Sequence, residues 1–321
     1  MEYGVWLEPA DGKEENMIYL DHAATTPTAP EARAAMEPYY HKRYGNASTP
    51  YEFGQRSRQA VENARTVIAD TLGVQPSEIY FTSGGTESDN WALKSTMEAY
   101  AYKGKHMITT QIEHHAIGNT CEYLRKRGFE VTELPVDREG RISMEQLERS
   151  IRPDTVLLSI MCANNEIGTL QDMETIGGIA QRRGIIFHTD AVQAYGQIPI
   201  DVKKWHVHML SASSHKFYGP KGCGFLYMKQ GLRTESMIHG GSQESGRRAG
   251  TENVPGIVGM AKAAQLAFAH MDETMERETW MRDRMIHHIC SEIPGAFLVG
   301  SLTERLPGNL NICFPGIQAS N

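Results

Sequence analysis

The stretch 155–189, TVLLSIMCANNEIGTLQDMETIGGIAQRRGIIFHT, carries the pattern that decides the fold. Its two ends, 155–161 and 184–189, are short and mostly apolar, which is typical of strands buried on both faces. Between them, apolar residues recur at helical spacing from Met173 to Ala180. A strand, a helix and a second strand in this order predict a mostly parallel sheet with helices on both sides.

The alternation continues outward in both directions. Further strands are predicted at 18–20, 78–82 and 106–110. A helix is predicted after the strand at 78–82, as far as about residue 102, and another after the strand at 106–110, as far as about residue 127. Two more helices are predicted before residue 78, the second over about 57–72. After residue 255, an apolar helix at 257–269 and a charged one at 272–289 lead into a tail, 296–314, with short strands.

These elements predict an α/β fold with a large domain and a smaller α+β domain. The expected divisions are an N-terminal extension at 1–16, an arm at 17–30, the large domain at 31–255 and the small domain at 256–321. Because only about two strands of the small domain are predicted before the sequence ends at Asn321, we expect this domain to be incomplete.

The composition excludes several classes of protein. With 321 residues, 40% hydrophobic residues and a net charge of −7, the chain is expected to be globular and to have no surface for DNA. Its five cysteines form no CxxC pair, so neither a disulfide framework nor a thiolate metal site is indicated. Residues 1–16 lack the apolar core of a signal peptide, and no apolar run approaches the roughly 20 residues that cross a membrane. We expect a cytoplasmic protein with reduced cysteines.

Polar residues follow the predicted strands at their carboxyl ends, where open α/β sheets bind ligands. The first group is Ser83–Thr86, SGGT, between a strand and a helix. Gly85 lets the backbone approach an anion, Thr86 adds a hydroxyl, and the helix N-terminus supplies free N–H groups. This group predicts a phosphate site, and a plain turn with Thr86 capping the helix is the alternative.

Three further strand ends carry groups suited to a planar ring. His114 can stack on a ring or move protons, and Asn165 can bind a ring oxygen or a substrate carboxylate. Asp190, with Gln193 one turn later, can pair with a protonated pyridine nitrogen. The alternatives are an exposed histidine at a helix start, a turn asparagine and an N-cap aspartate. A metal site joining His114 to other histidines is a weaker alternative, because these lack the usual ligand spacing.

The stretch Ser211–Gly224, SASSHKFYGPKGCG, is predicted to hold Lys216 on a tight loop, because glycines and a proline surround it. Beside Ser213 and His215, such a lysine suits a Schiff base, and an ordinary turn lysine is the alternative.

Together, these groups predict pyridoxal 5′-phosphate (PLP) as the cofactor. NAD needs no lysine, and ATP would need a Walker lysine and carboxylates for Mg²⁺. In this interpretation the phosphate is bound by the Gly85–Thr86 turn with Ser213 and His215, the ring nitrogen by Asp190, the phenolate oxygen by Gln193 and the aldehyde by Lys216.

The chain resembles the cysteine desulfurases of the NifS/IscS type, in the class V aminotransferase group of fold-type I PLP enzymes. The resemblance covers residues 18–314 and rests on the motifs YLDHAATTP, FTSGGTESDN, EHHA, NNEIG, HTDAVQ, SSHKFYGPKG and HGGSQESGRRAGTEN. It implies a three-layer PLP-transferase large domain in which Lys216 holds the cofactor and moves the α-proton, and His114 stacks on the ring. It also implies phosphate contacts from Gly85, Thr86, Ser213 and His215, ring contacts from Asn165, Asp190 and Gln193, and a homodimer in which Thr251 reaches the partner subunit's phosphate site.

The resemblance further implies conversion of L-cysteine to L-alanine. The sulfur passes through a persulfide on a loop cysteine to an iron–sulfur scaffold or a tRNA-thiolation protein, with no DNA or membrane partner. That cysteine and the arginine that binds the substrate carboxylate belong to a C-terminal segment that is not in this sequence. None of the five cysteines matches the loop cysteine, and Cys313 lies before the loop. We therefore expect PLP capture without persulfide formation, and weak or no activity of the chain alone.

Four readings of this sequence differ in their chemistry. Besides the desulfurase, the alternatives are another class V activity (selenocysteine lyase, cysteine lyase or aminotransferase), a non-catalytic PLP-binding protein, and a metal hydrolase.

Overall fold

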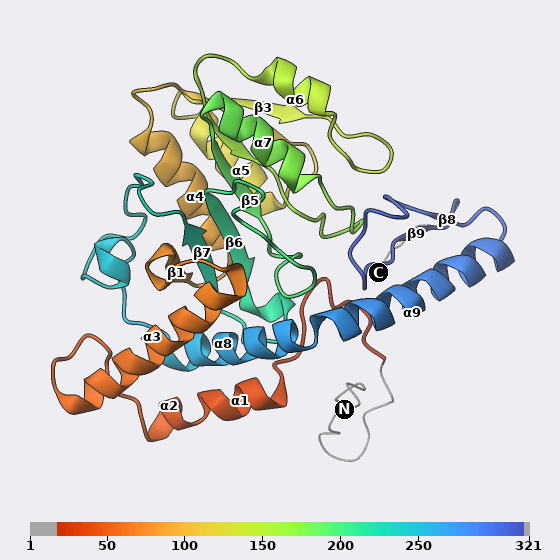
Figure 1. Ribbon diagram of the computed structural model, residues 1–321. Helices are drawn as coiled ribbons and strands as arrows, with labels where there is room; N and C mark the ends of the chain where they lie inside the picture. The colour runs from red at the N-terminus through yellow and green to blue at the C-terminus, as the bar shows by residue number, and fades with distance from the viewer. Residues whose placement is uncertain (1–17, 318–321) are drawn as a thin grey trace.

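The predicted sheet is present and has seven strands within residues 18–317, the part of the chain that the computed structural model describes (Figure 1). The strands are β1 (Ile79–Thr82), β2 (His106–Thr110), β3 (Glu130–Leu134), β4 (Thr155–Ser159), β5 (Ile186–Asp190), β6 (Met209–Ser213) and β7 (Gly224–Met228). Their order is β1-β7-β6-β5-β4-β2-β3. Neighbouring strands are parallel except at β7, which runs antiparallel to β1 and β6. The mostly parallel sheet is therefore confirmed.

Helices cover both faces of this sheet. The helices of residues 18–317 are α1 (Pro30–Met36), α2 (Pro38–His41), α3 (Glu52–Leu72), α4 (Gly85–Ala99), α5 (His115–Arg125), α6 (Met144–Ser150), α7 (Met173–Arg183), α8 (Val254–Ala269) and α9 (Met271–Glu292), of which α4 and α5 lie on one face of the sheet and α3, α7 and α8 on the other. Strand residues alternate between the two layers: Ile186 of β5 joins the core cluster of α4 and α5, whereas Phe187 joins that of α3, α7 and α8. The α/β fold class follows from this three-layer packing.

Several predicted elements were wrong or incomplete. Residues 18–20 form no strand, and Ile18 and Leu20 are exposed. Three helices, not two, precede residue 73, because Pro38 begins a separate helix, and α3 starts at Glu52. Strands β3, β6 and β7 and helix α6 were not predicted. The tight loop predicted at Lys216 contains a one-turn 3₁₀ helix, Ser214–Lys216, that ends at this lysine.

The C-terminal part begins with α8, which packs against α1 and α3 (Figure 1). It adds Ile257 and Met260 to the core cluster on that face of the sheet. After α9, the short strands β8 (Phe297–Leu298) and β9 (Ile312–Cys313) pair antiparallel. The domain divisions, including the boundary at residue 256, stay predictions, and the extension at 1–16 lies outside the described residues. Within residues 18–317, every helix is too short or too polar to span a membrane.

Candidate functional site

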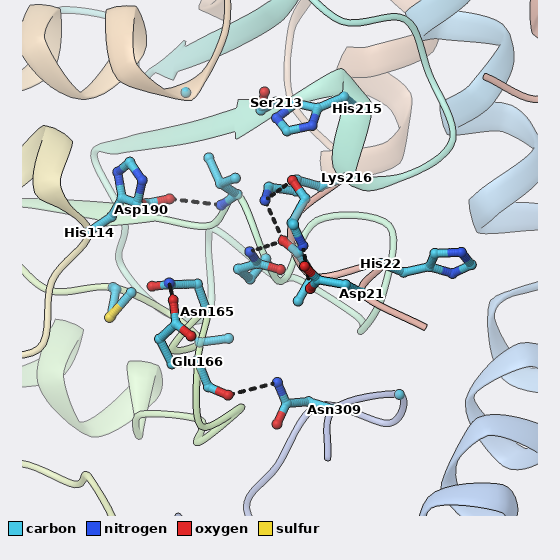
Figure 2. Close-up of a pocket in the computed structure, with 18 of the residues that line it drawn as sticks. Asp21, His22, His114, Asn165, Glu166, Asp190, Ser213, His215, Lys216 and Asn309 are labelled. Carbon is cyan, nitrogen blue, oxygen red and sulfur yellow. Dashed lines mark hydrogen bonds between the residues drawn. The ribbon is translucent and has the colours of Figure 1, made fainter. Parts of the chain in front are cut away.

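A cavity of about 600 Å³ lies where the strands of the sheet end (Figure 2). It receives residues from the carboxyl ends of β1, β2, β4, β5 and β6, which point the same way, and so meets the general rule for α/β sheets. Nine of the ten predicted site residues line it: Gly85, Thr86, His114, Asn165, Asp190, Gln193, Ser213, His215 and Lys216. The tenth, Thr251, is exposed and does not line it.

The turn between β1 and α4 forms one end of the cavity. Gly84 has a φ of 151°, a conformation that L side chains rarely adopt. A Cβ on Gly85 would lie 2.5 Å from Cγ2 of Val192, so a side chain would not fit at this position. The first N–H groups of α4 have no acceptor within the helix, and the helix dipole adds positive potential. This turn can therefore bind an anion through its backbone, with the Ser213 hydroxyl close by.

Asp190 and His114 also line the cavity, where they lie close to each other (Figure 2). The Asp190 carboxyl is buried, and its Oδ1 accepts a hydrogen bond from the Val192 N–H at 2.9 Å. Burial raises the pKa of Asp190, while the Val192 hydrogen bond and the charges of His114 and Lys216 oppose this rise. His114 caps α5, and its Nδ1 accepts a hydrogen bond from the N–H of Ala116 at 3.1 Å. A buried carboxyl and an imidazole thus face one part of the cavity.

Lys216 enters the cavity from the end of β6. Its Nζ donates hydrogen bonds to the carbonyl oxygens of Ala23 and Ala24, the latter at 2.9 Å. Burial lowers the pKa of the Lys216 amine, and the acids Asp190, Asp21 and Glu166 act in the opposite direction. An amine that loses its proton more readily than an exposed lysine can act as a nucleophile or as a base.

Gln193, Asn165 and His215 also line the cavity, and each makes a hydrogen bond to a neighbouring residue. Nε2 of Gln193 donates to the Ala23 carbonyl at 3.0 Å, and Nδ2 of Asn165 donates to Glu166 at 2.7 Å. His215 shares a hydrogen bond of 3.1 Å between its Nδ1 and the Thr25 hydroxyl. Burial and the neighbouring lysines lower the pKa of His215 to about 4, so its ring is neutral at pH 7.

Sequence reasoning missed three contributors to the cavity. The arm residues Asp21–Ala24 cover Lys216, and residues 308–311 line the opposite side. Side-chain amides of Asn309 and Asn311 hold this second segment to the carbonyl oxygen of Glu166 at 3.3 and 3.2 Å. Asp89, on the buried face of α4, also lines the cavity. Its position three residues after Thr86, one helical turn along the same face, was a signal in the sequence.

No cysteine lines this cavity within the described residues, which contain all five. Cys121, Cys162 and Cys223 are buried, and burial raises the pKa of each of these thiols to about 12. Cys290 and Cys313 are partly exposed on α9 and β9. In the same part of the chain, no three His, Cys, Asp or Glu side chains come together as metal ligands would.

Comparisons with known proteins agree with this geometry. Residues 18–321 match the family described as aminotransferase class-V. A protein of Methanosarcina thermophila named cysteine desulfurase IscS is 51% identical over 308 residues, which are 96% of this chain and 76% of that protein.

Two solved structures resemble this fold. A NifS-like protein superposes with a TM-score of 0.91 at 40% identity, over 94% of this chain and 82% of its own. A structure described as SspA in complex with cysteine gives a TM-score of 0.75 at 43% identity, over 77% of this chain and 72% of its own. The sheet, the cavity at its strand ends and the matched length of sequence lead to one conclusion: this chain belongs to the class-V aminotransferase family.

Proposed function

We propose that this chain is a PLP-dependent cysteine desulfurase, which takes sulfur from L-cysteine and leaves L-alanine. The observation that carries the proposal is the meeting of Lys216, Asp190 and the N-terminus of α4 in one cavity. The names of its relatives at 48–51% identity support the choice among class V activities.

The residues around the cavity fit PLP by their chemistry. The phosphate group needs an anion site without side chains, which the Gly84–Gly85 turn supplies. The ring nitrogen needs an acid and the aldehyde needs an amine, and Asp190 and Lys216 provide these groups. The cavity volume of about 600 Å³ lies within the range typical of small-molecule sites.

Bound PLP supplies an electron sink, because its protonated ring draws electrons from the α-carbon of an attached amino acid. The protein residues set up this chemistry. Asp190 would bind the protonated ring nitrogen, and His114 would contact the ring. The backbone N–H groups at Gly85 and Thr86, with Ser213 and His215, bind the phosphate.

The amine of Lys216 has two tasks in this proposal. It would hold the aldehyde of PLP, and as a free amine it would move the proton at the α-carbon of the substrate. The lowered pKa of Lys216 favours both tasks, because each needs the uncharged amine. Gln193 and Asn165 orient the ring and the substrate.

A second subunit completes the site in this proposal. Thr251 is exposed and lies outside the cavity of its own chain, so it is available to the phosphate site of a partner subunit. A homodimer is therefore proposed, and a molar mass of one chain, 35.9 kDa, in solution would contradict it. The sulfur acceptor is proposed to be a separate protein of iron–sulfur assembly or tRNA thiolation. A cytoplasmic location stays a prediction.

The activity is tested by incubating the PLP-loaded protein with L-cysteine and dithiothreitol as the sulfur acceptor. Because none of the five cysteines, all within the described residues, lines the cavity, the added thiol must take the sulfur directly, and alanine and sulfide are expected in equal amounts but at a low rate. Lys216→Ala should lose at least about 99% of this rate because no other amine takes its place. Lys221→Ala, an exposed lysine in the same stretch, is the matched control and should keep the rate. Keto acid in place of alanine would favour an aminotransferase, and release of neither would contradict the proposal.

A further inference from the structure

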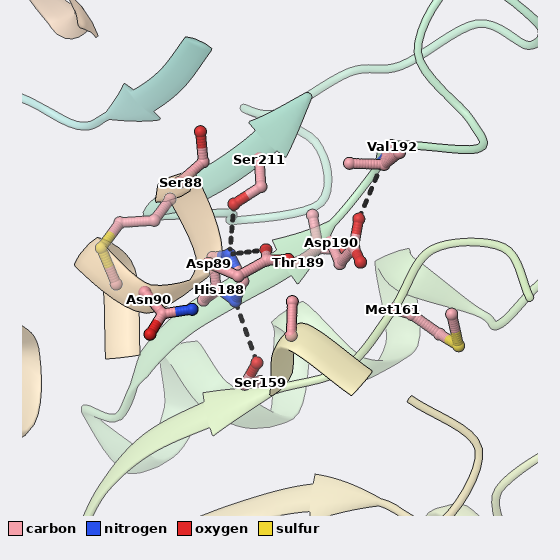
Figure 3. Close-up of polar contacts among 12 residues, drawn as sticks. Ser88, Asp89, Asn90, Ser159, Met161, His188, Thr189, Asp190, Val192 and Ser211 are labelled. Carbon is pink, nitrogen blue, oxygen red and sulfur yellow. Dashed lines mark hydrogen bonds and ion pairs between the residues drawn. The ribbon is translucent and has the colours of Figure 1, made fainter. Parts of the chain in front are cut away.

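Two buried acids, Asp89 and Asp190, line the cavity, and the proposed mechanism uses only Asp190 (both are labelled in Figure 3). Asp190 ends β5. Asp89 lies on α4 with 1% of its surface exposed, and it also lines the cavity. Burying an ionised aspartate costs free energy, so the protonation state of Asp89 decides whether a second negative charge lies near Asp190.

The fold places the two acids on one face of the sheet. His188 and Asp190 are two residues apart on β5, so their side chains point to the same side. This is the side that α4 covers, since Ile186 packs in one cluster with Trp91 of α4. Asp89, on the buried face of α4, therefore faces the side of β5 that carries His188 and Asp190.

His188 gives Asp89 no positive partner. Both ring nitrogens are already hydrogen-bonded, Nδ1 to the Ser159 hydroxyl at 2.9 Å and Nε2 to the Ser211 hydroxyl at 3.0 Å (Figure 3). Burial lowers the pKa of His188 to about 3, so the ring is neutral at pH 7. Nε2 lies 3.6 Å from Asp89 Oδ1, which is too long for a hydrogen bond.

The two acids have unequal surroundings. Asp190 accepts the Val192 N–H at 2.9 Å, and the positive charges of His114 and Lys216 favour its ionised form. Asp89 Oδ1 is buried without a hydrogen-bond partner. Burial raises the pKa of Asp89 well above its usual range, and the charge of Asp190 raises it further. A hydrogen bond with Ser211 acts in the opposite direction and lowers this pKa. If a single proton is shared, it lies on Asp89.

We propose that Asp89 is a positioning residue: it keeps the proton of this acid pair and so leaves Asp190 as the single ionised partner of the PLP ring nitrogen. The inference rests on the proposed function, in that PLP occupies the cavity. Loss of the Asp89 proton at alkaline pH would place a second negative charge beside the ring. The titratable groups that face the pair are His188 on β5, Glu113 after β2, His114 at the start of α5 and Lys216 after β6.

Glu113 supplies a matched control. Burial raises the pKa of its carboxyl to about 8, and its Oε2 is also buried without a partner. Its Oε1 is held by the Thr110 hydroxyl and the Met161 N–H, and the residue does not line the cavity. Glu113→Gln therefore removes a similar buried acid from outside the site.

The test compares PLP-loaded wild type, Asp89→Asn and Glu113→Gln by infrared and visible absorption as the pH is raised. At pH 7 each variant should lose part of the C=O band of protonated carboxyl groups. Wild type and Glu113→Gln should both show an alkaline transition of the PLP band, at somewhat lower pH in Glu113→Gln because the Glu113 charge helps to raise the pKa of Asp89. Asp89→Asn should lose this transition. An unchanged carboxyl band or an unchanged PLP transition in Asp89→Asn would overturn the proposal.

Two further outcomes are separable. Wild type without a PLP band at any pH would contradict the proposed function and, with it, this inference, whereas a normal band with no effect of Asp89→Asn contradicts the inference alone. Should Asp89→Asn fail to fold, Glu113→Gln answers the same question. A protonated carboxyl band that remains in that variant at pH 7 and is lost in the same alkaline transition as the change of the PLP band supports a proton on Asp89, and the absence of such a band overturns it.

Discussion

At the residue scale, the cavity depends on a position where a side chain is absent. Gly85 begins α4, and its Cα faces Val192 so closely that an added methyl group would collide with Cγ2. The same absence leaves the first N–H groups of the helix open to an anion. The absence of a side chain at Gly85 therefore serves both the packing against Val192 and the access of an anion to the N-terminus of α4.

Gly85→Ala should harm both properties. The added Cβ at 2.5 Å from Val192 Cγ2 should lower the free energy of unfolding by about 1 to 3 kcal/mol, as other overpacked sites do. It should also weaken PLP binding by at least about tenfold, because the turn must move. Urea unfolding and a titration with PLP measure the two effects.

Gly118→Ala is the control for this change. Gly118 lies exposed on α5, and an added Cβ would meet nothing within 4 Å. This substitution should raise stability by about 0.4 to 1 kcal/mol and leave PLP binding unchanged. Equal effects of the two substitutions on PLP binding would contradict the role given to Gly85.

At the element scale, the segment that precedes Thr251 is fixed to α3 and α4 by two ion pairs. Arg65 of α3 binds both oxygens of Glu244, at 2.7 and 2.8 Å, and also the Ile79 carbonyl. Arg248 binds both oxygens of Glu87 in the first turn of α4, at 2.7 and 3.0 Å. The segment that leads to Thr251, the residue proposed to reach a partner subunit, is thus anchored to the first turn of α4 in its own chain.

Arg65→Ala should lower the free energy of unfolding by about 3 to 5 kcal/mol, because it leaves the buried Glu244 carboxylate without its partner. Arg56→Ala, in the same helix, removes an exposed pair with Glu52 and should cost about 0.5 kcal/mol or less. Urea unfolding of both variants measures the difference. A cost below about 1 kcal/mol for Arg65→Ala would mean that the buried pair does not hold the segment.

At the scale of the whole molecule, the parallel sheet explains why distant residues meet. Gly85, His114, Asp190 and Lys216 follow four different strands whose carboxyl ends share one edge. Since that placement follows from the strand and helix pattern, both the α/β fold and the group of cavity residues could be predicted from the sequence. The roles of these residues in binding PLP stay proposals.

Other features depend on tertiary contacts that the sequence pattern does not reveal. Strand β6, MLSAS, is rich in small polar residues and becomes a strand through pairing with β5 and β7. The spacing of Asp89 from Thr86 indicated its face of the helix, but its burial against β5 depends on tertiary packing, because an acid on a helix normally faces solvent. Asn309 reaches the cavity across 143 residues of sequence by its bond to Glu166.

The most direct test of the central claim is the place where PLP attaches to the protein. The PLP-loaded chain is reduced with borohydride, digested and analysed by mass spectrometry. A reduced adduct is expected on the peptide that contains Lys216, retained in Lys221→Ala and absent from Lys216→Ala. An adduct on a different lysine, or no adduct in the wild type, would contradict the claim that this cavity holds PLP through Lys216.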